Sequence, residues 1–200
     1  MFKLDSVKQA SMNFDLDQTA VIVVDMQNCF AHEDGVLYAP PSGEVIPKIK
    51  EFVNTTRDEG ATVIYTRDTH TKNQFDSEFS HYNEFERWGV HALEGSWGHE
   101  IVDNLPVRST DTVIDKSTYD AFHNTDLDTI LTDQDIETVL VCGTLANVCV
   151  LHTASSAALH DYDTFVVEDL VGYIEEDHKT YSLDHVEWLF GDTVQSYSVI

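Results

Sequence analysis

The feature that most constrains this chain is a run of apolar, mostly β-branched residues, Ala20 to Val24, that ends abruptly at Asp25. A continuous apolar run of this length is typical of a strand that is buried on both faces of a parallel sheet. Comparable runs recur, more weakly in the last case, at 61–65, 112–114, 138–142, 164–167 and 193–199. The sequence therefore predicts five or six buried strands.

Segments with the spacing of amphipathic helices lie between these runs. The first is marked by Val45, Ile49, Phe52 and Val53, and the others span 101–105, 127–131, 148–160 and 178–190. Strands that alternate with helices form right-handed βαβ units, so we expect an α/β fold of three layers, with a mostly parallel sheet between helices. No linker or repeat divides the chain, and we expect one domain over 1–200 with its core at about 18–190.

Composition excludes several classes of protein. The 36 Asp and Glu residues against 11 Lys and Arg give a formal net charge of −25, which would repel nucleic acid and anionic membranes. The chain lacks an apolar stretch long enough to span a membrane and an N-terminal apolar signal, so we expect a cytoplasmic protein. The acidic residues are spread along the chain, and such self-repulsion is screened at high salt, which suggests a halophilic source.

The three cysteines, Cys29, Cys142 and Cys149, do not have the spacing of a disulfide framework and fit a reducing compartment. Cys149 follows the strand at 138–142 and falls in the first turn of the helix expected at 148–160. Backbone N–H groups there can lower a thiol pKa and bind an oxyanion, although a buried core cysteine is the alternative. Cys142 lies within a strand and is expected in the core, whereas Cys29 could line a pocket.

Ligands of parallel α/β sheets bind beyond the carboxyl ends of the strands. Asp25 follows the first strand, Lys116 the third and Cys149 the fourth. A base, a cation and a thiol at the same edge of the sheet are the groups that an activated cysteine nucleophile requires. Taken singly, Asp25 could instead cap a turn, and Lys116 could form a surface ion pair.

Asp68 and His70 follow the second strand and project the same way if the chain stays extended. They could share a metal ion with His91, because three protein ligands leave a position open for water or substrate. Asp76, Glu78, His81 and His99 compete for this assignment, and ordinary solvated loop residues are the alternative. The segment from about 68 to 100 is long, rich in aromatic residues and His, and therefore a candidate functional loop.

Three motifs in order resemble the superfamily of cysteine hydrolases that includes nicotinamidases and isochorismatase-like hydrolases. They are Val23-Val24-Asp25-Met26-Gln27-Asn28, then Ile114-Asp115-Lys116-Ser117 with Tyr119-Asp120-Ala121-Phe122, and Cys142-Gly143-Thr144-Leu145-Ala146-Asn147-Val148-Cys149-Val150. The resemblance covers about residues 18–190. It implies an isochorismatase-like fold, Asp25 as general base, Lys116 as its cationic partner and Cys149 as nucleophile. It also implies a cis Thr144-Leu145 peptide and an oxyanion hole from the N–H groups of Leu145 and Cys149.

Within that superfamily the chain is most similar to the nicotinamidases. Asp68-Thr69-His70, Arg87-Trp88-Gly89-Val90-His91 and Glu94-Gly95-Ser96-Trp97-Gly98 resemble their metal motif. Gly89 stands where that family usually has Pro, Ala92 where it has Cys, and Cys29 where it commonly has Asp.

The similarity to nicotinamidases implies deamidation of nicotinamide to nicotinate and ammonia through a Cys149 thioester. It implies one divalent metal on Asp68, His70 and His91, with Zn suited to these ligands and Fe or Mn also compatible. Trp88, Cys29, Phe30 and Tyr119 are the expected substrate-binding residues, and a homo-oligomer is expected. The alternatives are a metal-free ureido or carbamoyl amidohydrolase, an isochorismatase-type hydrolase and a non-catalytic interaction module.

Overall fold

The computed structural model describes residues 14–76 and 83–200 of the chain. A six-stranded sheet with the order β3-β2-β1-β4-β5-β6 lies at its centre, and every described pairing between these strands is parallel. The strands are β1 (Thr19–Val24), β2 (Thr62–Asp68), β3 (Thr112–Lys116), β4 (Thr138–Gly143), β5 (Asp163–Val171) and β6 (Asp192–Val194). The predicted α/β fold with a mostly parallel sheet is confirmed.

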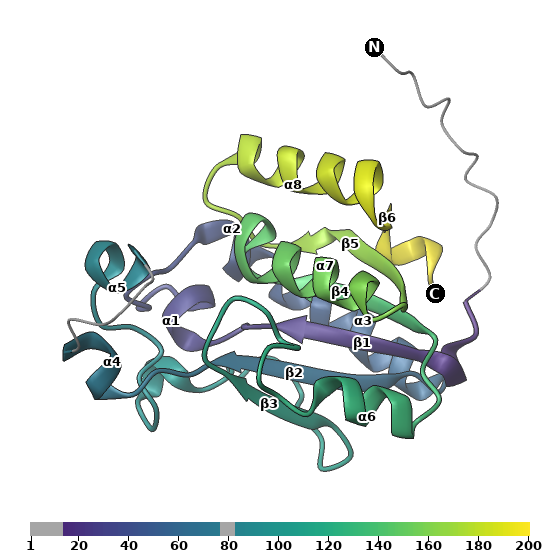
Figure 1. The fold of residues 1–200 in the computed structure, drawn as a ribbon, viewed down its shortest axis with the longest axis horizontal. Coiled ribbons are helices and arrows are strands. Elements are labelled where there is room, and N and C mark those ends of the chain that lie inside the picture. Colours follow the sequence, from purple (N-terminus) through teal and green to yellow (C-terminus); the bar gives the residue numbers. More distant parts are fainter. Residues whose placement is uncertain (1–13, 77–82) are drawn as a thin grey trace.

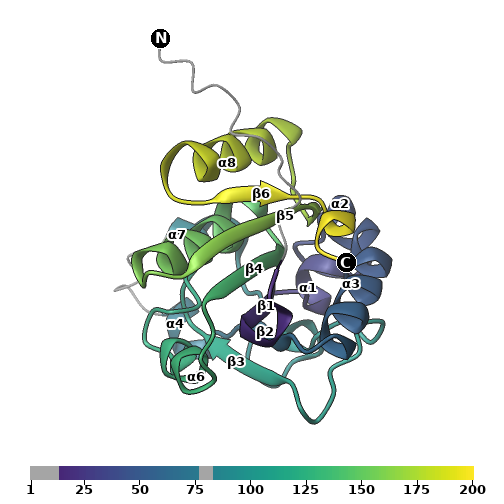
Figure 2. The ribbon, with the colours of Figure 1, turned by 90° about the vertical axis from the view of Figure 1, so that its right-hand side faces the viewer.

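The helices cover both faces of the sheet, as Figure 2 shows with the sheet seen nearly edge-on. Their bounds are α1 (Asn28–Ala31), α2 (Pro40–Glu44), α3 (Ile46–Asp58), α4 (Lys72–Asp76), α5 (Asn83–Trp88), α6 (Leu127–Asp133), α7 (Leu151–Leu159) and α8 (Glu176–Leu189). Short 3₁₀ turns occupy Leu16–Gln18, Trp97–His99 and Ser196–Ser198. The sheet is therefore the middle of three layers (Figure 1).

Each face of the sheet has its own apolar core. On one face Leu127 and Leu131 of α6 and Ala154 of α7 pack against strand residues such as Ile22. On the other face Ile49, Phe52 and Val53 of α3 pack against Val21 and Val23. Alternate residues of β1 thus enter opposite cores, which is why the whole strand is apolar.

Two predicted helices differ from the structure. Residues 101–105 form no helix: Ile101 pairs with Gln27 in an isolated antiparallel bridge, and Val102 and Leu105 are buried without a helical turn. The helix expected from Val148 begins as a π-helical turn, Ala146–Val150, and only Leu151–Leu159 is α-helical. Apolar spacing alone does not distinguish a buried loop or a widened turn from an α-helix.

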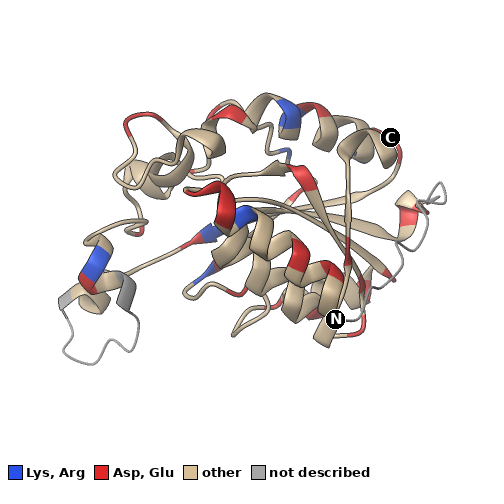
Figure 3. Cartoon of the chain, turned by 90° about the horizontal axis from the view of Figure 1, so that it is seen from above, with Lys and Arg blue, Asp and Glu red and all other residues tan. Residues whose placement is uncertain are grey.

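The acidic residues are distributed over helices, strand ends and loops, and Figure 3 shows no single acidic block in the part of the chain that the structure describes. None of the helices that the structure describes is long and apolar enough to cross a membrane. The expected halophilic source and cytoplasmic location stay predictions.

Candidate active site

Three strand ends bring Asp25, Lys116 and Cys149 into contact. Lys116 Nζ lies 2.7 Å from Asp25 Oδ2 and donates a hydrogen bond to Cys149 Sγ at 3.5 Å. Its third polar contact is the backbone carbonyl of Thr118, at 2.8 Å. All three side chains are buried, so the sequence-predicted base, cation and thiol form one cluster.

Asp25 is held by the strand beside it. Strand β1 ends at Val24, and Asp25 adopts a left-handed backbone conformation with φ of 49°, which turns the chain away from the sheet. The Thr66 hydroxyl donates to Asp25 Oδ1 at 2.6 Å and accepts the Asp25 N–H at 3.2 Å. Thr66 was not predicted as a site residue, because a threonine inside a strand carries no sequence signal that separates it from the core.

Burial and charge set the protonation states in this cluster. Burial raises the pKa of Asp25, and the Lys116 ammonium opposes that shift. Burial lowers the pKa of Lys116, but the charges of Asp25 and Cys149 outweigh it and raise the pKa above its ordinary value. Burial also raises the pKa of Cys149, which Lys116 opposes and Asp25 reinforces. These shifts favour an ammonium on Lys116 and a neutral thiol on Cys149.

Cys149 lies in the π-helical turn instead of the first turn of an α-helix. The preceding peptide, Thr144-Leu145, is cis, as the family resemblance implied. The carbonyl of Leu145 accepts from the N–H groups of Val148 and Val150. This tight turn places Leu145 and Cys149 in the lining of one pocket.

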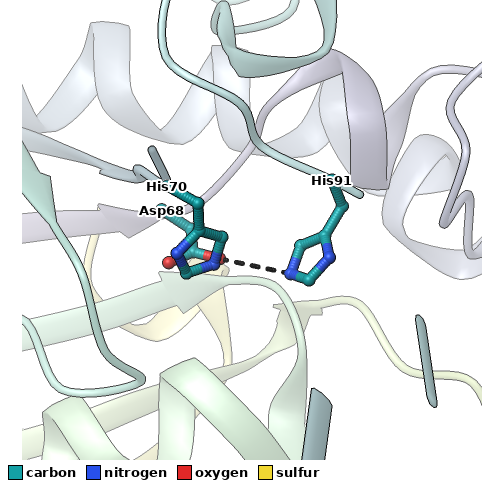
Figure 4. A group of neighbouring side chains, drawn as sticks. All are labelled: Asp68, His70 and His91. Carbon is teal, nitrogen blue, oxygen red and sulfur yellow. Dashed lines mark ion pairs between the residues drawn. The ribbon is translucent and has the colours of Figure 1, made fainter. Parts of the chain in front are cut away.

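Asp68, His70 and His91 form a second cluster beside the first (Figure 4). One ligand atom from each residue lies within 4.8 Å of the others, and all three residues are buried. Asp68 Oδ2 is 2.9 Å from His70 Nε2 and 3.9 Å from His91 Nε2. Two ligands of a tetrahedral zinc ion lie roughly 3.3 Å apart, so these separations suit a shared ion.

The hydrogen bonds of the two histidines test whether the cluster fits a metal. His70 is fully buried, and among the described residues its Nδ1 has no hydrogen-bond partner while its Nε2 faces the Asp68 carboxylate at 2.9 Å. His91 Nδ1 contacts the Gly89 carbonyl at 2.7 Å, which directs Nε2 toward Asp68. Burial lowers the pKa of His91 and favours the neutral ring that binds metals. The donor set therefore fits a divalent metal.

The competing ligands lie elsewhere. His99 Nε2 is 2.8 Å from the Thr69 hydroxyl and does not belong to the cluster. Glu78 and His81 lie outside the described residues, as does the side chain of Asp76.

Both clusters open onto one pocket of about 340 Å³, part of it continuous with solvent. Three aromatic side chains line it, Phe30, Trp88 and Tyr119, which were predicted to bind the substrate. Cys29 is not among the lining residues: its thiol is buried beside the Ala92 backbone and the backbone of Gly98. The structure thus brings together all the predicted site residues except Cys29.

Gln27 is a site residue that sequence reasoning did not single out. It is fully buried, and its side-chain amide bonds the backbone of Asp68 and of His99. Its place in the first motif, two residues after Asp25, was the available signal.

Comparisons with known proteins agree with this geometry. Residues 19–197 match the model of the isochorismatase domain. The ureidoacrylate amidohydrolase RutB of Cronobacter sakazakii is 28% identical over 182 residues, which cover 82% of this chain and 78% of that protein.

Two solved structures are similar over nearly their whole length. Pyrazinamidase of Pyrococcus horikoshii, in complex with zinc, has a TM-score of 0.80 at 28% identity and covers 89% of this chain and 99% of its own. N-carbamoylsarcosine amidase of Thermoplasma acidophilum has a TM-score of 0.76 at 30% identity and covers 90% of this chain and 96% of its own.

Proposed function

The chain belongs to the isochorismatase domain family as a cysteine hydrolase, and from that premise we propose that it deamidates nicotinamide to nicotinate and ammonia. The observation that carries this proposal is the cluster of Asp68, His70 and His91, which shares its pocket with Cys149. His70 Nε2 lies 2.9 Å from Asp68 Oδ2 and is bonded to no other described residue, which leaves it available to a metal that Asp68 also binds. The zinc complex of the similar pyrazinamidase supports the same interpretation.

In the proposed reaction Asp25 removes the proton of Cys149, and the thiolate attacks the carboxamide carbon. Lys116 stays charged and offsets the negative charge that moves between carboxylate, sulfur and substrate. The N–H groups of Leu145 and Cys149 stabilise the oxyanion. Ammonia leaves with the proton from Asp25, and a thioester remains on Cys149. Asp25 then takes a proton from the water that attacks the thioester, the bond between the acyl carbon and sulfur breaks to release nicotinate, and the proton returns from Asp25 to the Cys149 sulfur.

Asp68, His70 and His91 would hold a divalent metal, and Zn, Fe or Mn suits these ligands. When bound, the metal supplies a Lewis-acidic position that orients the pyridine ring. Trp88 and Phe30 flank the same space and offer apolar faces to an aromatic ring. Positioning the amide carbon against the Cys149 sulfur is the main contribution of these groups.

A ureido or carbamoyl amide is the second candidate, because RutB and N-carbamoylsarcosine amidase are relatives. Ureidoacrylate and N-carbamoylsarcosine each carry a carboxylate. The charged residues that line the described pocket are Asp25 and Asp68, and Lys116, buried behind them, is already bound to Asp25. A metal-free pocket with two carboxylates and one ammonium therefore favours an uncharged amide over an anionic one.

Ammonia release tests the proposal on protein whose bound metal has been quantified. Nicotinamide, ureidoacrylate and N-carbamoylsarcosine are compared at equal concentration in molar KCl. We expect turnover of nicotinamide with about one metal per chain. Turnover of a carboxylate-bearing substrate alone, by metal-free protein, would replace nicotinamide with the ureido or carbamoyl class. A folded protein that hydrolyses none of the three would contradict the amidohydrolase assignment.

A further inference from the structure

We propose that Gln27 is a positioning residue of the metal site. Its side chain holds the backbone of Asp68 by forming the hydrogen bonds that a neighbouring strand would otherwise form. This inference rests on the proposed metal role of Asp68, His70 and His91. It assigns a task to a buried side chain that takes no part in the mechanism above.

The sheet leaves the backbone of Asp68 without its neighbour on one side. Strand β2 runs to Asp68, but β1 ends at Val24, and its last pair with β2 is Val23 with Tyr65. Asp25 turns the chain out of the sheet immediately after β1. On its other side β2 is still paired with β3, where Asp68 lies opposite Lys116. A buried peptide group at such a gap needs another hydrogen-bond partner.

The side-chain amide of Gln27 supplies that partner. Its Oε1 accepts the Asp68 N–H at 2.8 Å, and its Nε2 donates to the Asp68 carbonyl at 2.9 Å. One side chain therefore bonds both polar groups of the same residue, as a strand would. Nε2 also donates to the His99 carbonyl at 2.9 Å, which ties the end of β2 to the turn at Trp97–His99.

This attachment matters because the Asp68 carboxylate must face several groups at once. Lys116 Nζ lies 3.7 Å from Oδ1, and the Nε2 atoms of His70 and His91 lie 2.9 and 3.9 Å from Oδ2. The backbone thus decides how far the carboxylate lies from Lys116 and from the metal cluster. His70 is attached separately, through its N–H to the Ala92 carbonyl at 3.0 Å.

The experiment compares zinc affinity in the wild type, Gln27→Met and Gln27→Glu, by competition with a chromogenic chelator. Met keeps the length of the side chain but has no amide, and a Glu carboxylate can accept from Asp68 N–H but cannot donate to the carbonyls. We expect the zinc Kd to rise about 10- to 100-fold in both variants. The visible spectrum of the cobalt-substituted protein should change as well, because the ligand geometry changes.

Asn28→Leu is the matched control. Asn28 is the next buried amide, and it donates to the Trp97 carbonyl at 2.9 Å in the same turn without a recorded bond to Asp68. It should lower the melting temperature of the metal-free protein while the zinc Kd stays within about twofold. If Q27M and Asn28→Leu lower the melting temperature alike and neither changes the zinc Kd, Gln27 is merely structural and the proposal fails.

Two further outcomes are decisive. If Q27M does not fold, Q27E decides the question by the same Kd measurement. If the wild type binds no zinc, the positioning role is overturned together with the metal site. Hydrolysis of nicotinamide is not needed for either measurement, so failure of the proposed substrate is recognised separately, by the ammonia assay.

Discussion

The two halves of the pocket are both buried and both polar, yet their polar groups are satisfied differently. In the half formed by Asp25, Lys116 and Cys149, the ammonium contacts a carboxylate, a thiol and a carbonyl. In the half formed by Asp68, His70 and His91, His70 Nδ1 has no hydrogen-bond partner among the described residues, and two imidazole nitrogens face one carboxylate oxygen, Asp68 Oδ2. The first half already contains a cation, Lys116, whereas the second half groups three ligand atoms that could hold one.

The comparison predicts that the two halves fail in different ways when residues are removed. The largest effect is expected for Cys149→Ala, which removes the proposed nucleophile and should lower kcat by about 10⁴-fold or more. Ammonia release at saturating substrate measures it, with metal content and circular dichroism unchanged. The control is Cys142→Ala, a buried cysteine of β4 in the core. Turnover that survives in C149A would show that Cys149 is not the nucleophile.

A smaller effect with a different signature is expected for His70→Ala. This change removes one of the three proposed metal ligands, so the metal Kd should rise by at least about 100-fold and KM should rise with it. Metal analysis after dialysis and steady-state kinetics measure the two effects. His99→Gln is the control, because His99 is also buried but contacts Thr69. If H70A retains a full complement of metal, the comparison between the two halves is wrong.

Thr66→Val sharpens the comparison within the first half. The valine keeps the shape of the side chain but loses the hydrogen bond to the Asp25 carboxylate. We expect kcat to fall about 10- to 100-fold with KM and metal content unchanged, since hydrogen bonds to charged groups are the strong ones. Thr66→Ser should recover most of the activity. Thr56→Val, in which a buried hydroxyl of α3 is lost far from the pocket, should leave kcat as it is.

Of these changes, salt concentration should affect kcat the least, but it should clearly change the melting temperature. The Asp25–Lys116 pair is fully buried and little screened by salt, whereas the net charge of −25 lies mostly on exposed residues. Melting temperature should therefore rise between low and molar KCl, by about 2–4 °C for each kcal/mol of repulsion removed. Differential scanning calorimetry measures it. An unchanged melting temperature would contradict the halophilic interpretation.

Sequence predicted the framework of the fold because buried parallel strands are continuous apolar runs. Five strands lie where they were predicted, and the sixth, predicted at 193–199, ends at Val194 and is followed by a 3₁₀ turn. The cluster of Asp25, Lys116 and Cys149 was predicted for the same reason: Asp25 and Cys149 follow strands, Lys116 ends one, and parallel strands bring their ends together. The helix at 101–105 was wrong, because a short apolar stretch also suits a buried loop.

The supporting hydrogen bonds could not be predicted in this way. Thr66 and Gln27 touch residues 41 positions away in the chain, and neither residue type signals such a contact. The placement of Cys29 was wrong for a similar reason, because its side chain faces the Ala92 and Gly98 backbone instead of the pocket.

The turn at Gly89 bears on how this protein could be re-engineered. Gly89 has a φ of 65°, in the left-handed region, and its carbonyl contacts His91 Nδ1. Proline fixes φ near −65°. A proline at position 89 therefore cannot keep this backbone, and introducing one would displace the carbonyl that contacts His91 Nδ1.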